Sequence, residues 1–127
     1  MERKFDLEER LINFAVRIIE LTESLKPTKA SNYLSGQILR SGTAPALQYG
    51  EAQSSESRKD FIHKMKIALK ELRETLVCLK VIHLSSSYNS EQQILDAINE
   101  SNELISIFVK SNETAQKNMI SEKNNEH

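Results

Sequence analysis

The sequence predicts an all-α fold, an antiparallel up-down-up-down four-helix bundle. Three observations lead to this prediction. Apolar residues recur in steps of three and four along most of the 127 residues, as on the buried faces of packed helices. Only two prolines and three glycines are present, which favours a few long helices over many short strands. Short polar segments separate the apolar patterns, as in bundles whose sequential helices run antiparallel.

The first helix is expected over about 7–25. Asp6 followed by Glu9 resembles a capping box, and Pro27 ends the pattern. Its seam consists of Leu7, Leu11, Phe14, Ile18, Leu21 and Leu25. The second helix is expected over 28–54, starting near Thr28 or Lys29, with apolar contacts from Tyr33, Leu34, Ile38 and Leu39.

The third helix is expected over 56–85, capped by Ser54 or Ser55. Its seam consists of Phe61, Met65, Ala68, Leu72, Thr75, Leu79 and Ile82. The fourth is expected over 90–114, capped by Asn89 or Ser90, with its seam at Ile94, Ile98, Ser101, Ile105 and Phe108. Residues 1–115 would thus form the bundle, and residues 116–127 a frayed polar tail.

The stretch LRSGTAPALQYGEA over 39–52 differs from the rest of the second helix. Gly42, Ala46 and Gly50 follow one another by four residues, which places a nearly bare face on a helix. Pro45 lacks an N–H for the Ser41 carbonyl and predicts a kink near Gly42–Pro45. Alternatively the helix breaks there, giving five helices. The bare face can pack against another helix of the same chain or against another subunit. The residues alone do not distinguish these two alternatives.

Composition narrows the class of protein. The net charge of −1 predicts no general affinity for nucleic acid, but residues 56–85 carry seven basic and four acidic side chains. That surplus either complements the acidic segment 86–127 or forms a basic binding face. With a single cysteine, no apolar stretch long enough to span a membrane and a charged N-terminus, we expect a cytoplasmic protein without disulfides.

The surplus of basic residues follows a heptad spacing. Lys59, Lys66, Arg73 and Lys80 recur every seven residues and form one stripe on the third helix. Arg58 and Lys70 extend the candidate nucleic-acid-binding set. No aromatic residue lies in the stripe, so we expect contacts to phosphates and no reading of base sequence.

Signals for catalysis are weak. Asp60 and His63 have the spacing of a di-metal carboxylate bundle, but no second copy of that motif exists. A metal-dependent enzyme around Asp60, His63, Glu71 and Glu74 is therefore the less favoured alternative. Cys78 is expected to pack and not to act as a nucleophile. We predict neither an enzyme nor a cofactor.

Arg40, Gln48 and Glu51 are the polar residues of interest on the second helix, because their spacing places them on nearly one face. They either form a buried network, for which an Arg–Glu bond between subunits would suit, or lie at a solvated edge.

The segments RSGTAPALQYGEA and SESRKDFIHKMKIALKELRETL resemble the bacterial four helix bundle protein family. The chain is similar to the intervening-sequence proteins encoded within some large-subunit ribosomal RNA genes. It resembles, more distantly, the accessory variability protein of diversity-generating retroelements. The densest matches are Arg40–Thr43, Glu51–Ala52, Ser57 with Asp60–Phe61, and Lys66–Glu71.

This resemblance implies a four-helix bundle that assembles as a ring-like homopentamer, and RNA or DNA as a candidate client. It favours a subunit interface at Arg40, Gly42, Ala46, Gln48, Gly50 and Glu51. We therefore predict a non-enzymatic homo-oligomeric scaffold. The alternative is a protein-only adaptor, such as a partner of a reverse transcriptase or of the ribosome.

Overall fold

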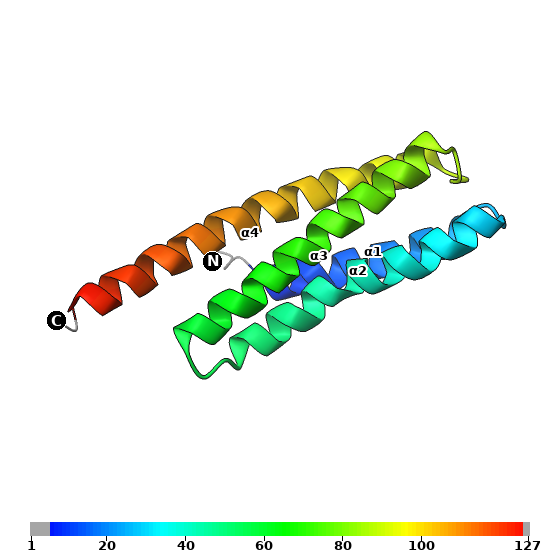
Figure 1. The fold of residues 1–127 in the computed structure, drawn as a ribbon. Helices are drawn as coiled ribbons and strands as arrows, with labels where there is room; N and C mark the ends of the chain where they lie inside the picture. The colour runs from blue at the N-terminus through cyan, green and yellow to red at the C-terminus, as the bar shows by residue number, and fades with distance from the viewer. Residues whose placement is uncertain (1–5, 126–127) are drawn as a thin grey trace, which may run out of the picture.

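Four antiparallel helices form the bundle in the computed structural model, which describes residues 6–125 (Figure 1). They are α1 (Leu7–Ser24), α2 (Lys29–Gln53), α3 (Arg58–Leu84) and α4 (Glu91–Asn125). Each helix packs beside the next in sequence, and α1 closes the bundle against α4 with the least extensive of the four contacts. The predicted up-down-up-down bundle is confirmed.

Side-chain caps start the four helices. Asp6, Thr28 and Ser57 each accept a hydrogen bond from the backbone N–H three residues later, at 3.0–3.1 Å. Ser90 does the same at 3.3 Å. These bonds satisfy N–H groups that have no partner within the helix. The predicted caps Asp6 and Ser90 are found, and Thr28, near which α2 was expected to start, is the cap of that helix. Ser57 replaces the predicted Ser54 or Ser55 because α3 begins at Arg58.

The core follows the predicted seams closely in α1 and α3. All six seam residues of α1 are buried, as are those of α3 except for Phe61, which is half-buried. In α2, Ile38 is fully buried but Tyr33 remains 67% exposed. In α4 the prediction is off by one residue at two positions. Ala97 and Leu104 are buried, whereas the predicted seam residues Ile98 and Ile105 are only half-buried.

α2 matches its expected extent, whereas α4 continues beyond it. α2 runs unbroken through the buried Pro45, which excludes the five-helix alternative. The predicted kink stays a prediction. α4 continues to Asn125, where we expected a frayed tail from residue 116. Ala115 is the last buried residue of α4, so the final turns of this helix extend past the bundle core as an overhang, visible at the red end of the chain (Figure 1).

The α1–α2 and α3–α4 connections meet at the end of the bundle away from the overhang. The backbone N–H of Lys26 donates to the carbonyl of Ser87 at 3.0 Å, joining the α1–α2 and α3–α4 loops. Ser86 adopts a positive φ of 55° in the second of these loops. No helix among the described residues is long and apolar enough to cross a membrane.

Candidate functional site

The basic stripe lies on the outer face of α3. From here on we include Lys70 in the stripe, because it is exposed one turn after Lys66. The five members Lys59, Lys66, Lys70, Arg73 and Lys80 are all exposed in the folded chain. Within residues 6–125, no carboxylate oxygen lies within 4 Å of any of these five cationic groups. The folded chain therefore leaves a row of uncompensated positive charge on one helix face.

Arg58 differs from the rest of the candidate set. Its guanidinium donates to both carboxylate oxygens of Glu122, with Nη2–Oε1 at 2.7 Å and Nε–Oε2 at 3.2 Å. This pair joins the start of α3 to the overhang of α4. Because the side chains of both partners are exposed to solvent, the pair contributes little to stability. Arg58 is thus engaged in the monomer, unlike the five stripe residues.

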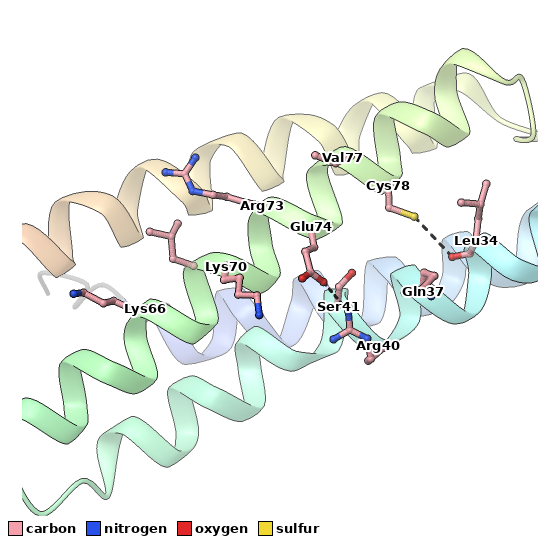
Figure 2. A pocket seen from close by; sticks show the side chains of 11 residues that line it. Leu34, Gln37, Arg40, Ser41, Lys66, Lys70, Arg73, Glu74, Val77 and Cys78 are labelled. Carbon is pink, nitrogen blue, oxygen red and sulfur yellow. Dashed lines mark hydrogen bonds and ion pairs between the residues drawn. The ribbon is translucent and has the colours of Figure 1, made fainter.

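A groove of about 680 Å³ runs along α3 beside α2, next to the stripe (Figure 2). Leu34 and Ser41 of α2 and Leu69, Val77 and Cys78 of α3 contribute to its lining, which is mostly apolar. Its rim includes Arg40, Lys66, Lys70 and Arg73. Val77 stands out because its side chain is 62% exposed in the middle of a helix.

This groove was not predicted from the sequence. Its only sequence signal is Val77, an apolar residue on the same outer helical face as Lys66, Lys70 and Arg73. A single apolar residue on a polar face carries little weight without the neighbouring helix in view.

Arg40 binds two carboxylates of α3. Its Nη1 donates to Glu71 Oε2 at 2.9 Å and its Nη2 to Glu74 Oε2 at 2.6 Å (Figure 2 shows Glu74). The hydrogen bonds to Glu74 and Glu71 raise the pKa of Arg40. Glu71 is the more buried partner, with 11% of its side chain exposed against 56% for Arg40. A buried carboxylate needs such a partner, so this pair fixes α2 against α3.

The three polar side chains singled out on α2, Arg40, Gln48 and Glu51, do not contact one another within the chain. Arg40 turns to α3, whereas Glu51, three turns along α2, is exposed and Gln48 is half-buried. The expected buried network of these three residues is therefore absent from residues 6–125 of the single chain.

Two further hydrogen bonds join α2 to α3 beside the groove, one from Thr75 and one from Cys78. The Thr75 hydroxyl lies 2.9 Å from Ser41 Oγ and 2.8 Å from the Glu71 carbonyl oxygen, and both side chains are buried. The Cys78 thiol donates to the Leu34 carbonyl at 3.8 Å. Burial raises the pKa of Cys78. The thiol therefore stays protonated at neutral pH, in line with the predicted packing role.

The small-residue face of α2 divides into two parts. Gly42 is buried under α1, and a Cβ there would lie 2.8 Å from Ile18 Cγ1. Its close approach thus occurs inside the chain, which corrects the expectation that Gly42 faces another subunit. Gly50 instead has no neighbouring atom within 4 Å of an added Cβ. Ala46 and Gly50 line a depression of about 650 Å³ next to Ile12 and Leu47.

The outer face of α1 and α2 carries exposed apolar side chains. Ile12, Val16 and Ile19 lie on α1 at helical spacing, each 39–47% exposed. Leu39 and Leu47 lie on α2, 40% and 69% exposed. We call these five residues the α1/α2 apolar face.

The alternative metal site is not assembled. Within residues 6–125, no group of three or more side chains is placed to bind a metal ion. The candidate ligands Asp60, His63, Glu71 and Glu74 therefore do not form a metal site. Glu71 and Glu74 instead hold Arg40, and His63 is exposed. These positions do not provide the inward-facing carboxylates that a bundle metal site requires.

Comparison with known proteins places this bundle in a family. The model of the 23S rRNA-intervening sequence protein family matches residues 3–110. The chain belongs to this family. The match ends before Ala115, so the overhang of α4 lies outside the shared region. The family resemblance predicted from the sequence is confirmed.

A solved structure supports the same assignment. The chain is similar to a protein of unknown function from the S23 ribosomal protein family of Bacteroides thetaiotaomicron, with 34% identity and a TM-score of 0.74. The likeness covers 83% of this chain and 96% of the other. No curated protein matches the chain. Neither the family nor this structure indicates a catalytic activity.

Proposed function

We propose that this protein is a non-enzymatic homo-oligomeric scaffold, a homopentamer, that binds RNA or DNA through the basic stripe of α3 in the cytoplasm. The observation that carries the proposal is the absence of carboxylate partners for the five stripe cations within residues 6–125. Such charges are available to phosphates, and binding releases the counterions condensed on the nucleic acid. The family name, which refers to 23S rRNA, agrees with an RNA client.

Self-association would strengthen this binding. One stripe offers few contacts and the chain as a whole carries a net charge of −1. Repetition of the stripe around a ring raises the effective concentration of each further contact. The proposed number of subunits rests on the family resemblance.

For the subunit interface we propose the α1/α2 apolar face together with Ala46 and Gly50. Exposed apolar area of this kind is a common mark of a contact surface. Of the residues expected from the sequence, Gln48 and Glu51 would lie at its edge, whereas Arg40 faces α3. Gly42 would act only indirectly, by keeping α1 close to α2.

The test measures mass and nucleic-acid binding on the same samples. Light scattering should give five times the chain mass, and Ile12→Glu with Leu47→Glu should reduce it to that of a monomer. Ile120→Glu, which changes an exposed apolar residue on the overhang, is the matched control. A wild-type monomer would contradict the assembly.

For binding, Lys66→Gln with Arg73→Gln should weaken affinity for a 30-nucleotide RNA and lower the slope of log K against log salt by about 2. The control is Lys29→Gln with Lys117→Gln, which removes the same charge away from the stripe. Equal loss in both double variants would contradict a specific role of the stripe.

A protein-only adaptor is the second candidate. The observation that favours it is the apolar groove between α2 and α3, which phosphate binding leaves unused.

A further inference from the structure

The groove has a lining that suits apolar side chains better than nucleotides. Leu34 and Leu69 are half-buried, Val77 is largely exposed, and the protonated thiol of Cys78 lies at the base. No aromatic side chain lines it. Bases bind single-stranded nucleic-acid sites chiefly by stacking on aromatic rings. The apolar lining therefore offers little to an RNA held by the neighbouring cations.

The groove has the length of a short helix. Along α3 its lining extends from Lys66 to Cys78, which at 1.5 Å per residue corresponds to about 18 Å. A partner helix of about twelve residues has the same length. Amphipathic helices bind in such grooves by apolar residues at positions i, i+3 or i+4, and i+7.

The charge of the rim determines which charge a bound partner should carry. Arg40 contacts Glu71 and Glu74 at 2.9 and 2.6 Å, which leaves this group with one net negative charge, and Glu74 also lines the groove. The three other cations of the rim outweigh that charge. Lys66, Lys70 and Arg73 have no such partner within the described chain. They border the apolar lining, so a helix with carboxylates beside its apolar face would be complementary in both respects.

We propose that the α2/α3 groove binds an acidic amphipathic helix of a partner protein. Its apolar side chains contact Leu34, Leu69 and Val77, and its carboxylates contact Lys66, Lys70 and Arg73. The helix uses three cations of the stripe that we assign to nucleic acid. Insofar as the proposed function holds, the helix and RNA therefore exclude one another, and the partner helix regulates RNA binding.

The experiment uses the full chain and a synthetic peptide as the probe. The peptide has sixteen residues, leucine at i, i+3, i+7 and i+10, and glutamate flanking that face. A peptide of the same composition in scrambled order has the same charge but no apolar face. Fluorescence anisotropy should show binding of the first peptide at least tenfold tighter than of the second.

Groove variants then locate the binding site. Val77→Glu should weaken the peptide at least tenfold, whereas Leu84→Glu should change its affinity less than twofold. Both residues are exposed on α3, at 62% and 83%, but Leu84 does not line the groove. Alkylation of Cys78, the only cysteine, with N-ethylmaleimide at alkaline pH should give the same loss as Val77→Glu.

Competition with RNA completes the test. The amphipathic peptide should displace a 30-nucleotide RNA from the wild-type chain but not from the Val77→Glu variant. If the peptide binds in a Val77-dependent way and RNA does not bind at all, the groove assignment stands and the proposed nucleic-acid function fails.

Three other results would overturn the groove assignment. Peptide affinity unchanged by Val77→Glu would place the peptide elsewhere. A smaller oligomer mass for Val77→Glu than for Leu84→Glu would mean that a second copy of the chain covers the groove. Loss of RNA binding in Val77→Glu equal to the loss of peptide binding would assign the apolar lining to nucleic acid.

Discussion

α2 packs against α1 and against α3 by two different means. On the α1 side, Gly42 removes the side chain that would separate the helices, and the buried Ile18 occupies the space. On the α3 side, Ser41 meets Thr75 and Arg40 meets Glu71. The first contact sets how closely two helices approach. The second sets which residues lie opposite one another, because each hydrogen bond is satisfied at only one alignment.

The steric contact should show the largest effect. Gly42→Leu would force atoms into Ile18, whose side chain is fully buried and branched at Cβ, and we expect a loss of about 3 kcal/mol of unfolding free energy. Gly36→Leu is the matched control, because a Cβ at Gly36 has no atom within 4 Å. It should be neutral or stabilise by up to about 1 kcal/mol through helix propensity. Urea unfolding followed by circular dichroism measures both.

Equal stability of these two variants would show that α1 and α2 are not held close by Gly42. The same measurement bears on assembly. An oligomer lost in Gly42→Leu would report damage to the fold, so only variants of the exposed apolar face test the subunit interface.

The polar contact should show an intermediate effect. Thr75→Val leaves the buried Ser41 hydroxyl without its Thr75 partner, and we expect a loss of about 1 kcal/mol. Adding Ser41→Ala should cost little more, since both polar groups are then gone. A double-mutant cycle in urea gives the coupling energy. Additive losses would mean that the two hydroxyls do not determine the alignment of α2 and α3.

The smallest effect concerns the other side of α1, where Arg10 pairs with Glu100 of α4 at 2.8 Å. The hydrogen bond from Arg10 lowers the pKa of Glu100. A carboxyl with a lowered folded-state pKa stabilises the protein above its ordinary value near 4.5, and this contribution is lost as pH falls through the lowered pKa. Because both side chains are partly exposed, we expect less than about 1 kcal/mol.

Glu100→Gln should therefore be less stable than wild type between pH 6 and 8, and the difference should shrink below about pH 4.5. Thermal unfolding across this pH range measures it. A difference that stays constant down to pH 2 would rule out the ionic contribution of this pair.

The sequence predicted the fold well where one physical signal dominates. The seam of α1 has six strongly apolar residues at regular spacing, and all six are buried. Caps at Asp6 and Ser90 follow from side-chain chemistry that acts within four residues. Such local and periodic signals do not depend on which helix lies opposite.

The sequence was less informative where contacts between helices decide the outcome. Gly42 and Gly50 share one helical face, yet only Gly42 lies under Ile18. Likewise the spacing of Arg40 and Glu51 placed them on nearly one face of the second helix, but the partners of Arg40 within the chain are 31 and 34 residues away in α3. The groove beside the stripe arises from two helices together. The stripe itself was predicted from its heptad spacing, because exposure of a charged helix face needs no partner.

The slight contact between α1 and α4 also has a consequence for how the chain folds. The α1–α2, α2–α3 and α3–α4 contacts join helices that are adjacent in sequence, so each forms by closing a short loop. Bringing Arg10 to Glu100 closes a loop of 90 residues and yields the least contact of the four. We therefore expect the docking of α1 onto α4 to be the last step when the chain folds.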